Sequence, residues 1–217
     1  MRKLIAIHHV TLDGVIQAPG GPEEDSSHGF AHGGWAMHYG PTGETIAGVY
    51  DLLLGRRTYE IFAAYWPYQG DHPIALAFNK ATKYVATRSL DHLDWENSQR
   101  MGDDVVAEVR RLKASAGPEL HVWGSSDLLQ TLIAADLVDE YRMWVFPLVL
   151  GEGKRLFEDG LPPRCLALVD TRSTPEGVLI NTYRPAGPLP AASDQAEAPS
   201  EAERTRRRKW AAEASGT

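Results

Sequence analysis

The segment around Gly55 constrains the fold of this chain most strongly. Its residues, in order, are Leu52, Leu53, Leu54, Gly55, Arg56, Arg57 and Thr58. An apolar run that stops at a glycine is typical of a buried strand, and residues 58–65 have the character of a helix that ends before Pro67. The N–H groups at a helix start and the guanidinium groups of arginine both bind phosphate. The segment therefore predicts a strand end that binds an anionic, phosphorylated ligand.

Two further segments repeat this pattern. A strand expected over residues 83–87 ends in Thr87, Arg88 and Ser89, and a strand over 120–123 is followed by Gly124, Ser125 and Ser126. Ligands of an open α/β sheet bind outside the carboxyl ends of its strands, so three such ends predict a ligand with several phosphates, such as a dinucleotide. Taken alone, Ser126 is explained better as the cap of the helix that follows.

The order of the segments predicts an α/β fold with a mixed, mostly parallel central sheet. The early strands alternate with helices, whereas the last two strands form an antiparallel hairpin with Pro175, Glu176 and Gly177 in its turn. Pro147 indicates a bulge or an edge position in the longest strand. The expected strands are 4–10, 50–54, 83–87, 120–123, 140–150, 165–172 and 178–183, and the expected helices are 44–49, 58–65, 103–115 with Asp103 as its cap, and one starting at Ser126.

Asp13 and the loop that follows it are candidates for the substrate side of the site. Asp13 stands in an Asp-Gly turn after the first strand, where its carboxylate either points into a crevice or only stabilises the turn. Residues 17–43 are rich in Gly, Pro and His and form a long loop, and loops of this length are typically lids or disordered segments. Trp35, His38 and Tyr39 in this loop could cover a planar ligand. The loop histidines lack accompanying metal ligands at suitable spacing, so no metal site is expected.

Composition excludes several classes of protein. The net charge of -7 argues against a general nucleic-acid or anionic-membrane binder. Cys165 is the single cysteine, which rules out an intrachain disulfide, and no apolar run reaches the ~18 residues of a membrane helix. We expect a cytoplasmic protein with a domain over residues 1–185. Residues 186–217 have almost no large apolar side chains and predict a disordered tail. For its basic cluster, 204–209, a solvated, weakly helical tail is favoured, and nucleic-acid or partner docking is the alternative.

Familiar nucleotide-binding fingerprints are absent from the sequence: there is no G-x-G-x-x-G, and residues 151–155 lack the spacing of a P-loop. Four other segments together resemble the dihydrofolate-reductase-like superfamily, and most closely the C-terminal reductase domain of the bifunctional riboflavin-biosynthesis deaminase-reductase. They are Leu12-Asp13-Gly14, the run from Leu54 to Glu60, the run from Gly124 through Leu128 to Glu140, and the run from Pro147 to Phe157.

The resemblance implies a three-layer dihydrofolate-reductase-like fold that binds NADPH. Carried over by motif, Thr87, Arg88 and Ser89 would lie near the 2′-phosphate of the adenosine, and Asp13 would be the catalytic residue beside the nicotinamide. The residues that would bind the cofactor are Gly55, Arg56, Arg57, Thr58, Thr87, Arg88, Ser89, Gly124, Ser125, Ser126 and Leu128. Trp35, His38 and Tyr39 would border the substrate.

The sequence departs from these families at three points. The helix before Leu52 lacks the acidic residue with which dihydrofolate reductases protonate the pterin, since Glu44 comes too early. Residues 38–50 contain no Arg or Lys, whereas the riboflavin enzymes have arginines there for the ribose phosphate of the substrate. Ser125 replaces a glycine. The first two departures argue against folate and against a phosphoribosylated pyrimidine as the substrate.

The leading hypothesis is a stand-alone, NADPH-dependent reductase of a small heterocyclic or carbonyl substrate, similar to the 5-amino-6-(5-phosphoribosylamino)uracil reductase domain of riboflavin biosynthesis. The alternative is a non-catalytic nucleotide- or flavin-binding module on the same fold. The resemblance also points to a homodimer. The aromatic residues of the long strand, Tyr141, Trp144 and Phe146, favour this because one face of a small sheet does not need so much apolar surface.

Overall fold

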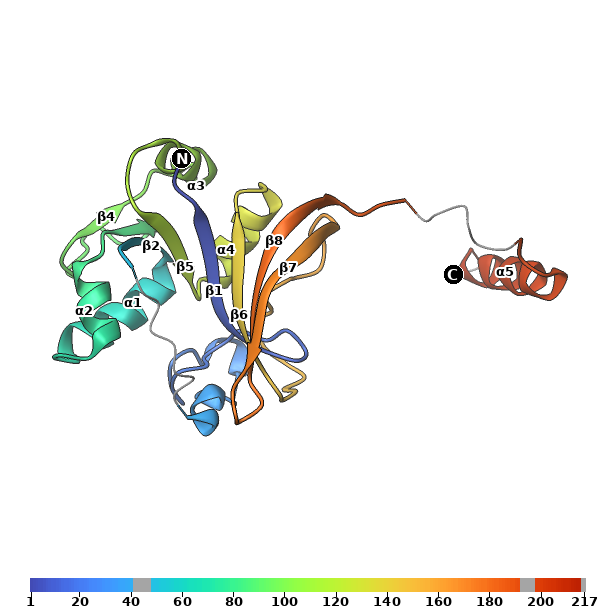
Figure 1. The fold of residues 1–217 in the computed structure, drawn as a ribbon, viewed down its shortest axis with the longest axis horizontal. Helices are drawn as coiled ribbons and strands as arrows, with labels where there is room; N and C mark the ends of the chain where they lie inside the picture. The colour runs from blue at the N-terminus through green and yellow to red at the C-terminus, as the bar shows by residue number, and fades with distance from the viewer. Residues whose placement is uncertain (41–47, 192–197, 216–217) are drawn as a thin grey trace. The chain divides into compact units, whose positions relative to one another are not determined.

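The computed structural model describes residues 1–40, 48–191 and 198–215, and within them eight strands form one sheet (Figure 1). The strands are β1 (Leu4–Thr11), β2 (Tyr50–Gly55), β3 (Lys83–Ala86), β4 (Ser98–Arg100), β5 (Glu119–Trp123), β6 (Glu140–Phe146), β7 (Arg164–Ser173) and β8 (Leu179–Pro188). Their order across the sheet is β4-β3-β2-β5-β1-β6-β8-β7. The pairings from β4 to β6 are parallel, and β8 is antiparallel to β6. The predicted mixed, mostly parallel sheet is therefore confirmed.

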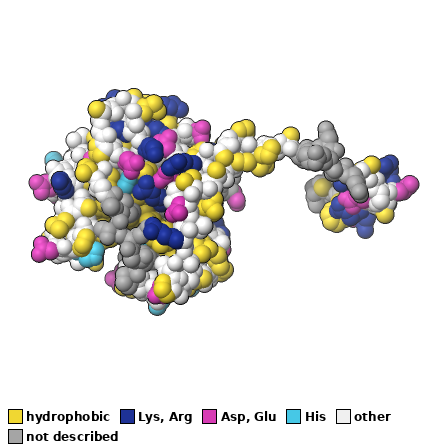
Figure 2. Space-filling view, in the orientation of Figure 1, with side chains coloured by type: hydrophobic (Ala, Val, Ile, Leu, Met, Phe, Trp, Pro, Cys, Tyr) yellow, Lys and Arg dark blue, Asp and Glu magenta, His cyan; other side chains and the backbone are white. Residues whose placement is uncertain are grey.

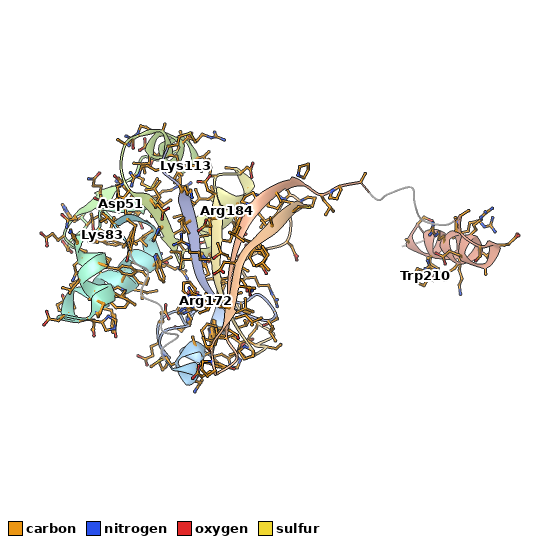
Figure 3. All side chains as sticks on the ribbon, viewed as in Figure 1. Asp51, Lys83, Lys113, Arg172, Arg184 and Trp210 are labelled. Carbon is orange, nitrogen blue, oxygen red and sulfur yellow. The ribbon has the colours of Figure 1, made fainter. Side chains whose placement is uncertain are left out.

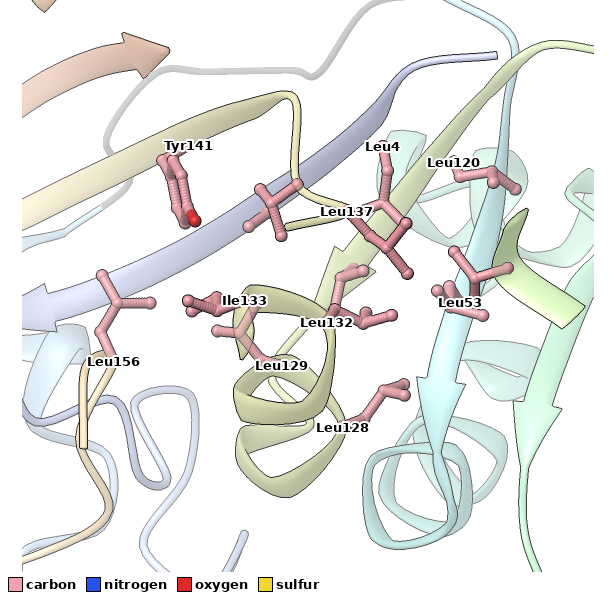
Figure 4. Close-up of a cluster of buried hydrophobic side chains, with 14 of the residues drawn as sticks. Leu4, Leu53, Leu120, Leu128, Leu129, Leu132, Ile133, Leu137, Tyr141 and Leu156 are labelled. Atoms are coloured by element: carbon pink, nitrogen blue, oxygen red, sulfur yellow. The ribbon is translucent and has the colours of Figure 1, made fainter. Parts of the chain in front are cut away.

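Helices on both faces make the fold three-layered. They are α1 (Arg56–Tyr65), α2 (Pro73–Lys80), α3 (Val105–Ala114) and α4 (Ser126–Ala134), with short 3-10 helices η1 (Ser27–Gly29), η2 (Trp35–Tyr39) and η3 (Trp66–Tyr68). Side chains alternate along β2: Leu53 joins the core under α3 and α4, shown in Figure 4, whereas Leu52 and Leu54 pack with Tyr59 of α1 and Phe78 of α2. Strands buried on both faces explain the apolar runs in the sequence.

The register of the parallel strands brings their carboxyl ends to one edge. Gly55 at the end of β2 pairs with Ala86 at the end of β3, and Leu53 pairs with Val122 near the end of β5. The polar residues that follow β2, β3 and β5 are thereby neighbours in space, although they are far apart in the sequence.

Several predicted boundaries were wrong for local reasons. β6 ends at Phe146 because Pro147 has no N–H to continue the ladder, and it lies between β1 and β8 rather than at an edge. α3 is capped by Asp104, which accepts a hydrogen bond from the N–H of Ala107 at 3.0 Å, rather than by Asp103. β4 and α2 were not expected. The helix expected at 44–49 falls mainly on residues outside those described.

Residues 188–217 form a separate unit that contains a helix, α5 (Glu201–Ala214), where a disordered tail was predicted. Ser200 caps this helix, Glu203 forms ion pairs with Arg206 and Arg207, and the Arg206 guanidinium lies 4.2 Å from the ring centre of Trp210 (Figure 3). No residue of α5 is buried. Capping and side-chain pairs three and four residues apart can favour a helix without a core.

The strand expected to contribute a dimer surface is covered within the chain itself. Tyr141, Trp144 and Phe146 are each at most 3% exposed. The homodimer therefore stays a prediction that depends on the family resemblance, without support from these aromatic residues.

No helix in the described ranges is both long and apolar enough to cross a bilayer. On the face seen in Figure 2, basic and acidic side chains are interspersed.

Candidate active site

The three predicted strand ends meet around one cavity of about 870 Å³, which we call the arginine cavity. The predicted cofactor residues that line it are Gly55, Arg56, Arg57, Thr58, Thr87, Arg88, Ser89, Ser125, Ser126 and Leu128. α1 starts at Arg56, so both arginines lie in the first turn of a helix, where backbone N–H groups have no partner within the helix. The cavity thus combines guanidinium groups with a helix N-terminus, an arrangement suited to phosphates.

The arginines of the arginine cavity differ in whether they already form ion pairs with carboxylates of the chain. Arg56 contacts Glu60 at 2.8 Å, and Arg57 lies 3.7 Å from Asp25. Arg88 is exposed and has no ion-pair partner in the described part of the chain. The Thr87 hydroxyl accepts hydrogen bonds from the N–H groups of Ser89 and Leu90 at 3.2 and 3.1 Å, which holds the turn around Arg88. Arg88 is therefore the cation most available to an anionic ligand.

Ser125 joins the starts of α1 and α4. Its hydroxyl accepts a hydrogen bond from the Gly55 N–H at 2.9 Å, and its own N–H donates to the Thr58 hydroxyl at 2.9 Å. The N–H groups of Gly55 and Ser125 are then not available for a phosphate, whereas the N–H groups of the first turn of α1 have no partner within the helix. Gly124 has a φ of +52°, and a Cβ there would lie 3.2 Å from the Thr58 hydroxyl oxygen, so both the backbone and the space favour glycine. Gly124 itself lines a second cavity rather than the arginine cavity.

We predict that Ser125→Ala lowers the free energy of unfolding by about 1–3 kcal/mol, because the Gly55 N–H loses its acceptor. Ser125 has a φ of +56°, a conformation that glycine adopts freely. Ser125→Gly should therefore cost about 1 kcal/mol less than Ser125→Ala. Urea denaturation of both variants measures the difference; equal stabilities would show that backbone strain at this residue contributes nothing.

The second cavity, of about 730 Å³, adjoins the first; we call it the aromatic cavity. The two share Asp25, Thr58, Ile61, Ser125, Ser126 and Lys154. Its aromatic wall is formed by Phe62, Tyr65, Trp66, Phe78 and Trp123. The loop of residues 16–25 and the end of β1, with His8 and His9, complete it. A ligand long enough to pass the shared residues could occupy both cavities.

A polar network holds the 17–27 loop at the junction of the cavities. The Gln17 amide donates to the carbonyl oxygens of Asp25 and Ser27, both at 3.0 Å, and accepts from the Lys154 N–H at 3.0 Å. The Lys154 ammonium lies 2.6 Å from the Asp25 carboxylate. Burial acts to raise the pKa of Asp25, but the hydrogen bonds from Lys154 and Ser27 outweigh it, so the pKa is lowered. Asp25 and Lys154 therefore form a charged pair that fixes the loop.

Comparison with known proteins identifies the family. The profile of the RibD C-terminal domain matches residues 2–180. The chain belongs to the RibD C-terminal domain family. Two Bacillus subtilis (strain 168) proteins, both called uncharacterized, are similar along most of their lengths. YyaP is 30% identical over 188 residues, which is 84% of this chain and 94% of YyaP. YwjB is 28% identical over 188 residues, 84% of this chain and 98% of YwjB.

Solved structures show the same fold. A protein from Shewanella sp. PV-4 assigned to riboflavin biosynthesis superimposes with a TM-score of 0.65 at 18% identity, covering 84% of this chain and 98% of that one. Dihydrofolate reductase from Enterococcus faecalis, complexed with NADP(H) and RAB-propyl, gives a TM-score of 0.51 at 17% identity, covering 85% and 96%. The predicted dihydrofolate-reductase-like fold is thus confirmed. Family and fold together support a reductase-type function for this RibD C-terminal domain.

Asp13 lies outside both cavities of this RibD C-terminal domain. Its carboxylate accepts hydrogen bonds from the Thr11 hydroxyl at 2.6 Å and from the N–H groups of Gly151 and Leu150 at 2.8 and 3.3 Å. Burial acts to raise the pKa of Asp13, but these hydrogen bonds lower it below its ordinary value. The carboxylate therefore stays charged and ties the 12–14 turn to the 148–155 loop. These contacts are those of the turn-stabilising alternative, and the catalytic role of Asp13 stays untested by them.

The three residues predicted to border the substrate also lie elsewhere. Trp35 is buried, donates its indole N–H to the Gln17 carbonyl at 2.7 Å and packs edge-on against Phe146. The Tyr39 hydroxyl donates to the Pro147 carbonyl at 3.4 Å, and His38 is exposed. η2 covers the core next to β6, so it is the earlier part of the loop, residues 16–25, that faces the aromatic cavity. The sequence has no local pattern that distinguishes residues 16–25, which line the cavity, from residues 35–39, which cover the core.

The aromatic wall was not predicted as part of the site. Phe62 and Trp66 stand four residues apart and share a face of α1 and its extension, a pattern that indicates core packing as readily as a ligand wall. Phe78 comes from α2, a helix that was not expected. Trp123, at the end of β5, stood next to a predicted cofactor segment and was the one signal in the sequence that could have indicated the wall.

His8 makes stability depend on pH. It is 3% exposed, and its Nε2–H donates to the Gly124 carbonyl at 2.9 Å. Burial lowers the pKa of His8 from 6.5 to about 4, although this hydrogen bond opposes the shift. The unfolded chain therefore binds more protons between pH 6.5 and pH 4, and the free energy of unfolding should fall as the pH drops through this window.

The expected loss from His8 is at most about 1.4 kcal/mol per pH unit. Urea denaturation at pH 7 and pH 5 measures it, and His8→Gln should reduce the pH dependence. A pH dependence that is unchanged in this variant would contradict the assignment of the titration to His8.

Proposed function

We propose that this RibD C-terminal domain is an NADPH-dependent reductase of a small heterocyclic or carbonyl substrate. The observation that carries the proposal is the pair of adjoining cavities, one with arginines and a helix N-terminus and the other with an aromatic wall. A dinucleotide has the same two parts, charged phosphates and a planar nicotinamide. When bound, NADPH supplies the hydride.

The residues of the arginine cavity fit the charged half of NADPH. Arg88, free of an ion pair within the described ranges, would bind the 2′-phosphate, and Arg56 and Arg57 at the start of α1 would bind the phosphates that join the two nucleosides. Ser125 and Thr58 hold the two helix starts in place through the hydrogen bonds between them. The support is the convergence of three strand ends on one cavity that is large enough for a nucleotide.

The residues of the aromatic cavity would orient the nicotinamide and the substrate and exclude water from them. Glu24 is the carboxyl group best placed to hold a proton there. It lines the cavity, and one of its oxygens accepts a hydrogen bond from the Gly20 N–H at 2.6 Å. Burial raises the pKa of Glu24 above its ordinary value, as a general acid requires. Glu24 thus takes the role that the sequence suggested for Asp13.

Titration of the protein with NADPH tests the proposal most directly. Trp66 and Trp123 line the aromatic cavity, so bound nicotinamide should quench tryptophan fluorescence in a saturable manner. Turnover is then followed as the loss of NADPH absorbance over a panel of carbonyl compounds and heterocycles. A wild-type protein that shows no saturable quenching and no NADPH binding by calorimetry would contradict the proposal.

Two substitutions separate a reductase from a non-catalytic binding module. The binding module is the second candidate because Asp13 lines neither cavity. Glu24→Gln should lower kcat about 10²- to 10⁴-fold, the range for a general acid, and leave the Kd for NADPH within about twofold. Asp13→Asn should lower stability but leave kcat nearly unchanged. NADPH binding without oxidation by any compound of the panel, in the wild type as in both variants, would favour the binding module instead.

A further inference from the structure

The wall of the aromatic cavity is continuous. The ring centre of Phe62 lies 6.2 Å from that of Trp66, Trp66 lies 5.3 Å from Phe78, and Phe78 lies 5.4 Å from Trp123. These three pairs meet edge to face, whereas Phe62 and Phe78 are stacked with ring centres 5.4 Å apart, and aromatic side chains favour both arrangements. The wall runs from α1 and η3 through α2 to the end of β5 and gives the aromatic cavity a continuous apolar side.

The charged side chains around this wall are mainly acidic. Glu23, Glu24 and Asp25 come from one loop and all line the cavity. Lys154 is the one Lys or Arg among its described lining residues, and its ammonium is bonded to Asp25 at 2.6 Å. A phosphate in this cavity would face carboxylates without an unpaired cation, and such repulsion is strong where water is partly excluded.

The two cavities therefore differ in their cations: Arg56, Arg57 and Arg88 line only the arginine cavity, where Asp103, Asp104 and Asp127 also lie. Glu23 and Glu24 line only the aromatic cavity, beside the aromatic rings. We propose that the aromatic cavity binds, as the substrate, an uncharged planar heterocycle that carries no phosphate group. This inference rests on the proposed function, because it assigns the arginine cavity to the cofactor. It names the substrate class that the aromatic cavity accepts.

Riboflavin and FMN are suitable probes because they share a planar ring system and differ only by a phosphate. The protein is first saturated with NADP⁺, which cannot reduce the flavin, and is then titrated with each flavin while the quenching of flavin fluorescence is followed. Riboflavin should bind about tenfold more tightly than FMN at low ionic strength. Added salt should narrow the difference, since it screens the repulsion of the phosphate.

Matched variants assign the preference to this cavity. Glu23→Lys places a cation on the exposed part of the acidic loop and should improve FMN binding, whereas Glu158→Lys, at an exposed residue outside both cavities, should not. Trp66→Ala should weaken both flavins to a similar extent. If Trp66→Ala fails to fold, Tyr65→Ala tests the same point, because Tyr65 belongs to the wall and is half-exposed. Tyr68→Ala is the control, because Tyr68 is an exposed ring outside both cavities.

The outcomes distinguish this inference from the proposed function. Normal NADP⁺ binding with FMN bound as tightly as riboflavin, or with neither flavin bound, would overturn the inference and leave the proposed function in place. Flavin affinity unaffected by both wall variants would also overturn it. Failure of NADP⁺ and NADPH to bind the wild type would instead count against the proposed function.

Discussion

Replacing Arg88 by alanine is expected to raise the Kd for NADPH about ten- to a hundredfold and to leave the Kd for NADH nearly unchanged. The loss of one charge-assisted hydrogen bond typically weakens binding by ~1.5–3 kcal/mol, which corresponds to this range. Arg88 lines the arginine cavity and has no competing ion-pair partner in the described part of the chain. NADH lacks the 2′-phosphate, so it has no group for Arg88 to bind.

The measurement is a fluorescence titration with both nucleotides. Arg110→Ala is the matched control, since Arg110 is an exposed arginine of α3 outside both cavities. Arg56→Ala should weaken both nucleotides, and by less, because Glu60 already pairs with Arg56 in the free protein. If Arg88→Ala weakened NADPH and NADH equally, Arg88 would not be at the 2′-phosphate.

Asp51→Ala should lower the free energy of unfolding by about 3–5 kcal/mol, the usual cost of breaking a buried ion pair. Asp51, at the start of β2 (Figure 3), accepts a hydrogen bond from the guanidinium of Arg2, whose side chain is 3% exposed. Arg2 also donates to the Pro118 carbonyl at 2.6 Å. The pair thereby joins the N-terminus to the starts of β2 and β5. This edge of the sheet is opposite the edge where the strands end at the arginine cavity. Without Asp51, the buried charge of Arg2 has no counter-ion.

The exposed Arg56–Glu60 ion pair is the control for the buried Arg2–Asp51 pair. The Arg56 and Glu60 side chains are 41% and 44% exposed, so Glu60→Gln should change stability by less than about 1 kcal/mol. Urea denaturation measures both variants under the same conditions. Equal losses for Asp51→Ala and Glu60→Gln would mean that burial does not determine the contribution of these pairs.

The meeting of three strand ends at the arginine cavity could be predicted because the residues that line it follow directly after strands. Leu52–Leu54 is apolar throughout since both faces of β2 are buried, and parallel strands must end at a common edge. The strand pattern therefore predicts that Arg88 and Ser125 lie at the same edge of the sheet, although the two residues are far apart in the sequence. The same reasoning does not place Asp13, Trp35 and Tyr39, because they belong to a turn and a long loop whose path no local pattern specifies.

The sequence by itself determined seven of the eight described strands, where three of them end, and which charged groups follow those ends. These are local properties, set by burial periodicity, glycine and helix starts. Only the tertiary structure decided which part of the 17–39 loop faces the cavity, that Asp13 ties two loops together, and that Phe62, Trp66, Phe78 and Trp123 form one wall. Those features depend on long-range packing, because an aromatic side chain has the same sequence pattern in a core as beside a ligand.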